Sequence, residues 1–431
     1  MSTPAAARPL AAAAAPRAGV VRRYGLWLVG AAVLVALPHV IRAGVAVPIM
    51  NQMGIAIVFA LAFNMLFGQG GMLSFGHAVY FGLGGFLAAH ALNLAVRNGL
   101  YLPVPLVPLV GGLGGLLFAA LFGTFSTMRA GTVFAMISLG VAELMASSAL
   151  IFDRFFGGEE GISTNRAKAP LLLGLQFTHD RQVYYLIAFW VFVAALAMYA
   201  FSRTPVGRMA NAVRDNPERA EFVGYSQRWV RYVCFCASGF FAGIAGGLFA
   251  VNYEILNAEN MGLGASGAVL FMAFIGGAGH FVGPIVGAIV YTFLQSMLSD
   301  YTSVWLLYLG LLFLTTVLFV PMGLVGVFML HVPVWRSHRV GRLLGPYLLA
   351  ALVGLVAVVG AIGLLEMIHF VVYADTTQMT KRLFWVTVPV RTVWPWLAFG
   401  ALTVAGGLGL RWVAPRVVTA FAEASGLVSA R

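Results

Sequence analysis

Residues 203–231 read RTPVGRMANAVRDNPERAEFVGYSQRWVR, a densely charged stretch in a chain that is 61% hydrophobic and 9% charged. Six arginines stand against three acids in it. Thr204 can cap a helix that starts at Pro205, because proline lacks an N–H that the first turn would leave unpaired. Asn216 and Pro217 start a second helix, and Gly224 lies where a left-handed C-cap would end it. This pattern predicts a structured basic docking surface between membrane spans; the alternative is a solvated loop that only sets topology.

The composition predicts an all-α polytopic membrane protein. The chain has 431 residues and a mean hydropathy of +0.92. Its apolar runs can cross about 30 Å of hydrocarbon, and they suggest about ten core transmembrane helices plus two extra C-terminal ones. The arginines behind the net charge of +12 cluster at the ends of these runs. That is the positive-inside pattern of a protein in membrane lipid, so no nucleic acid is expected as a partner.

The apolar runs divide the chain into three regions. Residues 1–23 are expected to be a disordered cytoplasmic N-terminus, 24–330 a transmembrane domain, and 331–431 a C-terminal extension with two further apolar segments. The expected core spans are Tyr24–Ile41 and, with loose boundaries, 47–67, 72–92, 104–126, 130–150, 183–202, 232–252, 264–279, 281–298 and 303–320. The C-terminal spans are expected at about 344–370 and 393–413.

Charge sets the expected topology. The polar link Ile151–Gln182 is neutral, whereas Arg203–Arg231 is net positive, so the two are expected on opposite sides with the basic one in the cytoplasm. If both C-terminal runs span, their basic linker Val371–Arg391 lies outside, against the charge rule. The alternative is a re-entrant or surface-lying hairpin. Spanning is favoured, because late short loops obey the rule least strictly.

Asn64–Phe86 is not an ordinary span. Seven glycines in this stretch are too many for an undisturbed helix, and Asn64, Gln69, Ser74 and His77 supply polar groups at membrane depth. Irregular backbone there needs neighbouring protein or a water-lined cavity, and such segments often line a translocation route. The alternative is tight helix packing around small residues. His77 by itself is read as a hydrogen-bonded packing residue in preference to a proton relay.

Three other features lie within the apolar sequence. Gly276, Gly277, Gly279, Gly283 and Pro284 within Phe274–Pro284 predict a tight hairpin, or less simply a ligand-contacting loop. Gly239, Gly243 and Gly247 recur on one helix face and predict close helix packing. Glu143 is an acid within an apolar span. It either makes an internal ion pair or hydrogen bond, or lines a path through the membrane.

The sequence contains no motif for chemistry of its own. Its two lysines, Lys168 and Lys381, end no phosphate-binding loop, so this chain is not expected to bind ATP by that device. The sequence has no metal-binding or hydrolase motif, and Cys234 and Cys236 alone make no zinc site. We therefore expect no catalytic residues, no metal and no enzyme activity.

Six sequence blocks carry a family resemblance. They occur in this order: Asn64–Phe86, Arg129–Glu143 (RAGTVFAMISLGVAE), Phe156–Ile162 (FGGEEGI), Gly207–Gly224 (GRMANAVRDNPERAEFVG), Phe241–Ala250 and Ile275–Gly287. Together they resemble the LivM-type permease subunits of branched-chain amino-acid ABC importers, and Phe319–Val327 (FVPMGLVGV) is similar to the family's closing motif. The resemblance covers about residues 45–328.

The resemblance implies a bacterial inner-membrane permease that binds no cofactor itself. Its implied partners are a LivH-type sister permease, two cytoplasmic ABC ATPases that use the ATP, and a periplasmic substrate-binding protein. The substrate pathway is expected to include Asn64, Gln69, Ser74, His77 and Glu143. The resemblance assigns ATPase coupling to Gly207, Arg208, Ala212, Arg214, Glu218, Ala220, Glu221 and Gly224.

Two departures from the family leave alternatives open. Met72 stands where many members have glutamine, so the solute is either a branched-chain amino acid or one like urea, a short amide or an aromatic acid. Family members usually end near residue 330 or continue into a fused ATPase.

An ion-coupled secondary transporter would use His77, Glu143, Glu254 or His280, and a membrane scaffold would need no broken segments. The coupling segment favours the importer over both.

Overall fold

The computed structural model describes residues 18–41, 44–170, 176–336, 340–373 and 379–425. The helices of the first part are α1 (Ala18–Val40), α2 (Ala46–Asn64), α3 (Ala78–Asn98), α4 (Val107–Ser126), α5 (Thr132–Ile151), α6 (Asp153–Phe156), α7 (Asp180–Arg203), α8 (Pro205–Asp215), α9 (Pro217–Phe222) and α10 (Gln227–Tyr253). They are followed by α11 (Leu263–Gly276), α12 (Gly283–Tyr301), α13 (Trp305–Phe319), α14 (Gly323–Arg336), α15 (Gly341–Tyr373) and α16 (Val393–Ser425). Short 3-10 turns lie at Val104–Leu106, Arg166–Lys168 and Ala258–Met261.

The strands are short and pair in two antiparallel ribbons. In the first, β1 (Ile162–Ser163) pairs with β2 (Ile255–Leu256), with Ile162 opposite Leu256. In the second, β3 (Thr380–Leu383) pairs with β4 (Val386–Pro389), with Leu383 opposite Val386. The predicted fold class, an all-α polytopic membrane protein, is confirmed.

The number of full-length spans is lower than expected. In the described ranges, eight helices are long and apolar enough to cross a membrane, or nine if α13 and α14, which bend by 43°, form one span. Trp27–Val40 and α11 are apolar but shorter. The glycine-rich hairpin explains α11: Gly277 has a φ of +103°, so the helix ends at Gly276 and α12 begins after the turn. The start of α1 at Ala18 lies inside the region expected to be disordered; residues 1–17 lie outside the description.

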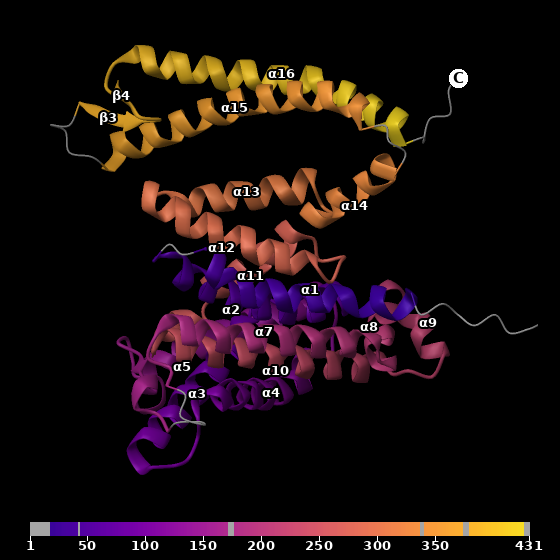
Figure 1. The fold of residues 1–431 in the computed structure, drawn as a ribbon, viewed down its shortest axis with the longest axis vertical. Helices are drawn as coiled ribbons and strands as arrows, with labels where there is room; N and C mark the ends of the chain where they lie inside the picture. The colour runs from indigo at the N-terminus through magenta and orange to yellow at the C-terminus, as the bar shows by residue number, and fades with distance from the viewer. Residues whose placement is uncertain (1–17, 42–43, 171–175, 337–339, 374–378, 426–431) are drawn as a thin grey trace, which may run out of the picture. The chain divides into compact units, whose positions relative to one another are not determined.

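The chain forms two compact units, Met1–Leu270 and Phe271–Arg431. The first unit is built around α10, which packs against α2, α3, α4 and α7 (Figure 1). Glycines allow the closest of these contacts: a Cβ on Gly111 of α4 would lie 2.5 Å from the carbonyl oxygen of Gly243 on α10. The packing role predicted for Gly239, Gly243 and Gly247 is confirmed.

The expected irregular stretch is irregular in its first part only. A π-helical turn, η1 (Met65–Gln69), follows α2, and residues 70–77 are not helical. Regular helix α3 resumes at Ala78, six residues after the expected start of that span. Gly84 lies within the regular helix α3 and packs against α10: a Cβ on Gly84 would lie 2.5 Å from the Cα of Gly243. This glycine serves helix packing and does not interrupt the helix. We call residues 65–77 the break.

The second unit ends in a long helical hairpin. The helices α15 and α16 have 33 residues each, about 50 Å, and lie side by side with the β3–β4 ribbon at one end (Figure 1). Glu366 of α15 accepts hydrogen bonds from Thr302 (2.7 Å) and Tyr308 (2.9 Å) and pairs with Lys381 of β3 at 2.7 Å. This network joins the C-terminal extension to α12 and α13. The compact units divide after Leu270, and the predicted domain boundary at residue 330 stays a prediction.

Candidate functional site

The basic segment has the two-helix structure that the sequence predicts. The Thr204 hydroxyl accepts a hydrogen bond from the Gly207 N–H at 3.2 Å, and α8 follows. The Asn216 side chain accepts one from the Arg219 N–H at 3.0 Å, and α9 follows. Gly224 has a φ of +90°, a left-handed conformation that favours glycine. Both caps and the position of the C-terminal turn are confirmed.

The coupling residues named from the sequence fall into two groups. Gly207 and Ala220 are buried and Ala212 is half-buried, so these three pack the segment against the rest of the unit. The charged members and Gly224 are exposed: Arg208, Arg214, Glu218 and Glu221. The resulting surface carries both signs of charge and is open to a partner.

Apolar side chains on the same surface were not singled out from the sequence. Phe222 is 91% exposed and Val223 is 67% exposed, at the end of α9, and Trp229 at the start of α10 is also exposed. Exposed aromatic residues are frequent binding anchors in protein interfaces. The available signal was their position within an otherwise charged stretch.

Arg214 connects α8 directly to the break. Its Nη1 donates a hydrogen bond to the carbonyl oxygen of Gly68, within the π-helical turn. Its Nε donates to Asp215 at 2.9 Å, which fixes the guanidinium from the other side. Gly71, with a φ of +66°, lies against the arginine stem: a Cβ there would be 2.6 Å from Arg214 Cγ. Through these contacts, a displacement of α8 would also displace residues 68–71.

The polar residues predicted along the pathway are concentrated around this break. Asn64, Ser74 and His77 are buried, and Gln69 is half-buried. Within the described structure, Asn64 Oδ1, Gln69 Oε1, Ser74 Oγ and both His77 ring nitrogens have no hydrogen-bond partner. A buried polar group without a partner destabilises a fold by about 1–3 kcal/mol, so these unpaired groups are unusual in the interior of a protein. The His77 ring stacks on Phe59 at 5.4 Å, so it packs as expected, but the hydrogen bonds expected of it are not found among the described residues.

Three buried serines support the break from neighbouring helices. Ser138 of α5 accepts a hydrogen bond from the Phe75 N–H at 3.0 Å, and Ser266 of α11 accepts one from the Ala78 N–H at 3.1 Å. Ser238 of α10 donates to the Ala62 carbonyl at 2.7 Å. They satisfy backbone groups that the irregular chain leaves unpaired. Sequence reasoning missed them, because serines are common in membrane helices and local sequence does not identify their partners.

Glu143 does not join this group. It lies on the exposed face of α5, and among the described residues it forms no ion pair. The internal ion pair that its sequence position allowed is therefore not found in this part of the structure.

Glu254, an alternative coupling acid, has a structural environment. It follows α10 with a φ of +57°, and its carboxylate accepts a hydrogen bond from the Arg166 N–H at 2.6 Å. The buried Arg166 side chain donates to the Val251 and Asn252 carbonyls at 3.0 and 2.8 Å and pairs with Asp180 at 3.1 Å. This arginine satisfies the last carbonyls of α10 and fixes the link that carries β1. The arrangement favours a structural role for Glu254 over ion coupling.

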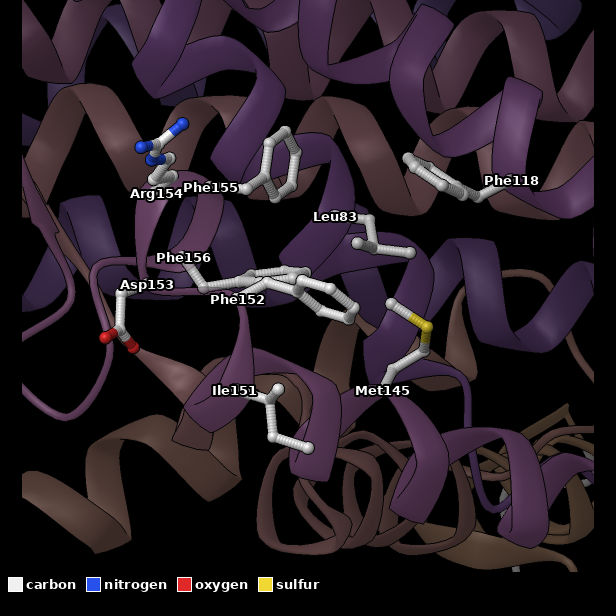
Figure 2. A pocket seen from close by; sticks show the side chains of 9 residues that line it. All are labelled: Leu83, Phe118, Met145, Ile151, Phe152, Asp153, Arg154, Phe155 and Phe156. Atoms are coloured by element: carbon white, nitrogen blue, oxygen red, sulfur yellow. The ribbon is translucent and has the colours of Figure 1, made fainter.

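A cavity of about 660 Å³ lies elsewhere in the first unit, and its lining is mostly apolar. Figure 2 shows the phenyl rings of Phe118, Phe152, Phe155 and Phe156 around it, with the charged ends of Asp153 and Arg154 to one side. None of the polar residues at the break lines this cavity. Its chemistry suits apolar groups and not a small polar solute.

Comparisons with known proteins identify the family of this chain. Residues 45–321 match the family model for the branched-chain amino acid transport system / permease component. The high-affinity branched-chain amino acid transport system permease protein LivM of Escherichia coli is 28% identical over 69% of this chain and 74% of its own length. The probable LivM permease of Methanocaldococcus jannaschii is 25% identical over 64% and 92%.

One relative has a different name. The guanosine ABC transporter permease protein NupQ of Bacillus subtilis is 27% identical over 29% of this chain and 39% of its own length. No solved structure matches this chain. The family model covers more than half of the chain, together with the break, the supporting serines and the capped basic segment. The chain belongs to the family of branched-chain amino acid transport system permease components, as a LivM-type permease.

Proposed function

We propose that this chain is a transmembrane subunit of an ABC importer and translocates branched-chain amino acids or a related small polar solute. A periplasmic binding protein delivers the solute, and a LivH-type sister permease completes the pathway. Two cytoplasmic ATPases use the ATP, so this subunit needs no cofactor and no ATPase site. In this proposal the chain lies in the bacterial inner membrane with its N-terminus in the cytoplasm.

The hydrogen bond from Arg214 to Gly68 is the observation that carries the proposal. It joins two features that a membrane scaffold would not need together. One is the exposed, capped segment of residues 204–224, which we call the docking segment, and the other is an interrupted helix with unpaired buried polar groups. An ATPase that pushes on the surface of α8 and α9 would move Arg214, and Arg214 would move residues 68–71. The π-helical turn can change its hydrogen bonding with little loss, because π-turns and glycines are easily rearranged.

The solute would be recognised at the break. Asn64, Gln69, Ser74 and His77 offer neutral donors and acceptors, which suit the ammonium, carboxylate or amide groups of small solutes. Met72, which lies between Gln69 and Ser74 in the sequence, is buried. The family resemblance implies a glutamine at this position. This residue and the guanosine permease among the relatives favour a second candidate: a permease of the same kind for urea, a short amide, an aromatic acid or another non-branched solute.

The test is uptake by the complete importer in proteoliposomes, with ATP hydrolysis measured in parallel. Arg214→Ala is expected to lower uptake about tenfold or more while the ATPases still bind and hydrolyse ATP, because the link to the break is lost but the exposed surface remains. Arg411→Ala is the matched control: it removes an exposed arginine of α16, which is not part of α8 or α9, and should change uptake less than about twofold.

Equal uptake in the Arg214→Ala and control variants would contradict the transmission route. If purified protein without ATPases moved solute down an ion gradient, the importer itself would be the wrong proposal. Competition among branched-chain amino acids, urea, short amides and aromatic acids in the same vesicles then identifies the solute class.

A further inference from the structure

Among the long spans of the first unit, α5 is the least buried. Its span is 33% buried, against 44% for α4, 67% for α2 and α3 and 78% for α10, whereas α15 and α16 of the second unit are 11% buried. Its exposed side chains repeat at helical spacing along one stripe: Met136, Gly140, Glu143, Ser147 and Leu150. We call this stripe the α5 face.

Glu143 makes a lipid environment unfavourable for the α5 face. It is near the middle of a 20-residue apolar helix, and no ion-pair partner is found for it in the described ranges. An acidic side chain at this depth is costly in hydrocarbon and normally faces a protein partner or water. By contrast, the buried carboxylate of Glu366 has three side-chain partners within this chain: Thr302, Tyr308 and Lys381.

The exposed face of α4 provides the contrast. Its outward residues Leu113, Leu117 and Leu121 are 55–61% exposed and entirely apolar, as lipid contact requires. The α5 face has small and polar residues along its helix: Gly140, Glu143 and Ser147. A Cβ on Gly140 would meet nothing within 4 Å, so no contact within this chain requires glycine there. Small residues permit the close approach of a second helix.

The α5 face also lies one helix away from the break. The opposite, buried side of α5 carries Ser138, which holds the Phe75 N–H, and Ala142, which lies against Gly76. A second hollow of about 450 Å³ lies between residues 71–75 and the α5 residues Met136 and Leu139. Met136 belongs to the α5 face and also lines this hollow, so a partner on that face would cover the hollow. The partner would then affect the break through α5.

We propose that the α5 face, centred on Glu143, is the contact surface for the second permease chain of the importer, which places a basic or amide side chain against Glu143 within the membrane. This inference rests on the proposed function and locates its partner. The charge of Glu143 identifies the complementary chemistry: a lysine, arginine, histidine, asparagine or glutamine on a facing transmembrane helix.

Photo-crosslinking in native membranes tests the location. A benzophenone amino acid is placed at Met136 or Ser147 of the α5 face, and at Leu117 of α4 as the control, in the full chain expressed with its partners. The crosslinked peptides are identified by mass. We expect both α5 positions to react with a second permease chain, and Leu117 to give lipid adducts only.

A pair of glycine substitutions tests the close approach without disturbing this chain. Gly140→Leu should reduce co-purification of the second permease about tenfold, because the added side chain fills the space that the partner helix needs. Gly407→Leu on α16 is the matched control, since that glycine is also exposed and a Cβ there would meet nothing within 4 Å. Both variants should melt at the same temperature when purified alone.

Glu143 variants test the charge. Glu143→Gln should retain co-purification within about threefold, because an amide can still accept a hydrogen bond, whereas Glu143→Lys should lose it. Lipid adducts alone from the α5 positions, crosslinks to another copy of this chain, or equal co-purification in all variants would overturn the inference. If the second permease co-purifies but reacts with a different face, the proposed function stands and this location is wrong. If no second permease co-purifies, both fail.

Discussion

Two glycine-rich regions lie within the first unit, and they use glycine for different purposes. At the contact of α4 and α10, the glycines sit in regular helices and let two backbones touch, with no polar side chain at the contact positions Gly111, Gly115 and Gly243. At the break, the glycines accompany non-helical backbone, unpaired buried polar atoms and a hydrogen bond to the docking segment. Glycine content alone does not distinguish a packing contact from a candidate functional site. The unpaired buried polar groups distinguish the break from the contact of α4 and α10.

The largest effect that this comparison predicts is at the helix contact. Gly243→Leu should prevent folding or lower stability by about 3 kcal/mol or more, because a Cβ on Gly243 would already lie 2.9 Å from the Cα of Gly115. The measurement is the yield and melting temperature of the protein purified from membranes. Gly407→Leu, at an open position on α16, serves as the control. A Gly243→Leu protein that melts like the control would show that this contact is not part of the core.

The sequence predicts the coupling segment almost completely, because its signals are local. Thr204, Pro205, Asn216 and Pro217 determine caps and helix starts within a few residues, and Gly224 provides the left-handed turn. The same local reasoning placed the irregular backbone near Asn64 but extended it too far. Whether a glycine breaks a helix or packs it against another depends on the neighbour, and Gly243 of α10, which Gly84 contacts, is more than 150 residues away from it in the sequence.

Long-range contacts account for the rest of what the sequence could not show. Arg214 and Gly68 are 146 residues apart, and nothing near either residue indicates their hydrogen bond. Whether the Glu143 side chain is exposed or buried also depends on how α5 packs against other helices, which the local sequence does not show. In the C-terminal extension, the basic linker Val371–Arg391 is against the charge rule if both runs span. Its Lys381 pairs with Glu366, so one of the linker's positive charges is compensated within the chain.

A smaller effect is predicted at the break itself. Ser74→Ala should leave the free energy of unfolding unchanged or raise it by about 1 kcal/mol, because the Ser74 hydroxyl is buried and has no partner among the described groups. The same change should alter the order in which competing solutes inhibit uptake. Ser299→Ala, at an exposed site on α12, is the control and should change neither quantity. If Ser74→Ala destabilises the fold and leaves solute preference unchanged, Ser74 packs and does not bind.

The central claim is that movement of the docking segment reaches the break through Arg214. The most direct measurement is the rate at which a water-soluble thiol reagent modifies Ser74→Cys in the assembled importer, after Cys234 and Cys236 are replaced by alanine. ATP should change this rate about tenfold when Arg214 is present, because residues 68–74 move with α8, and should leave it unchanged in the Arg214→Ala background. An equal response to ATP in both backgrounds would contradict the account.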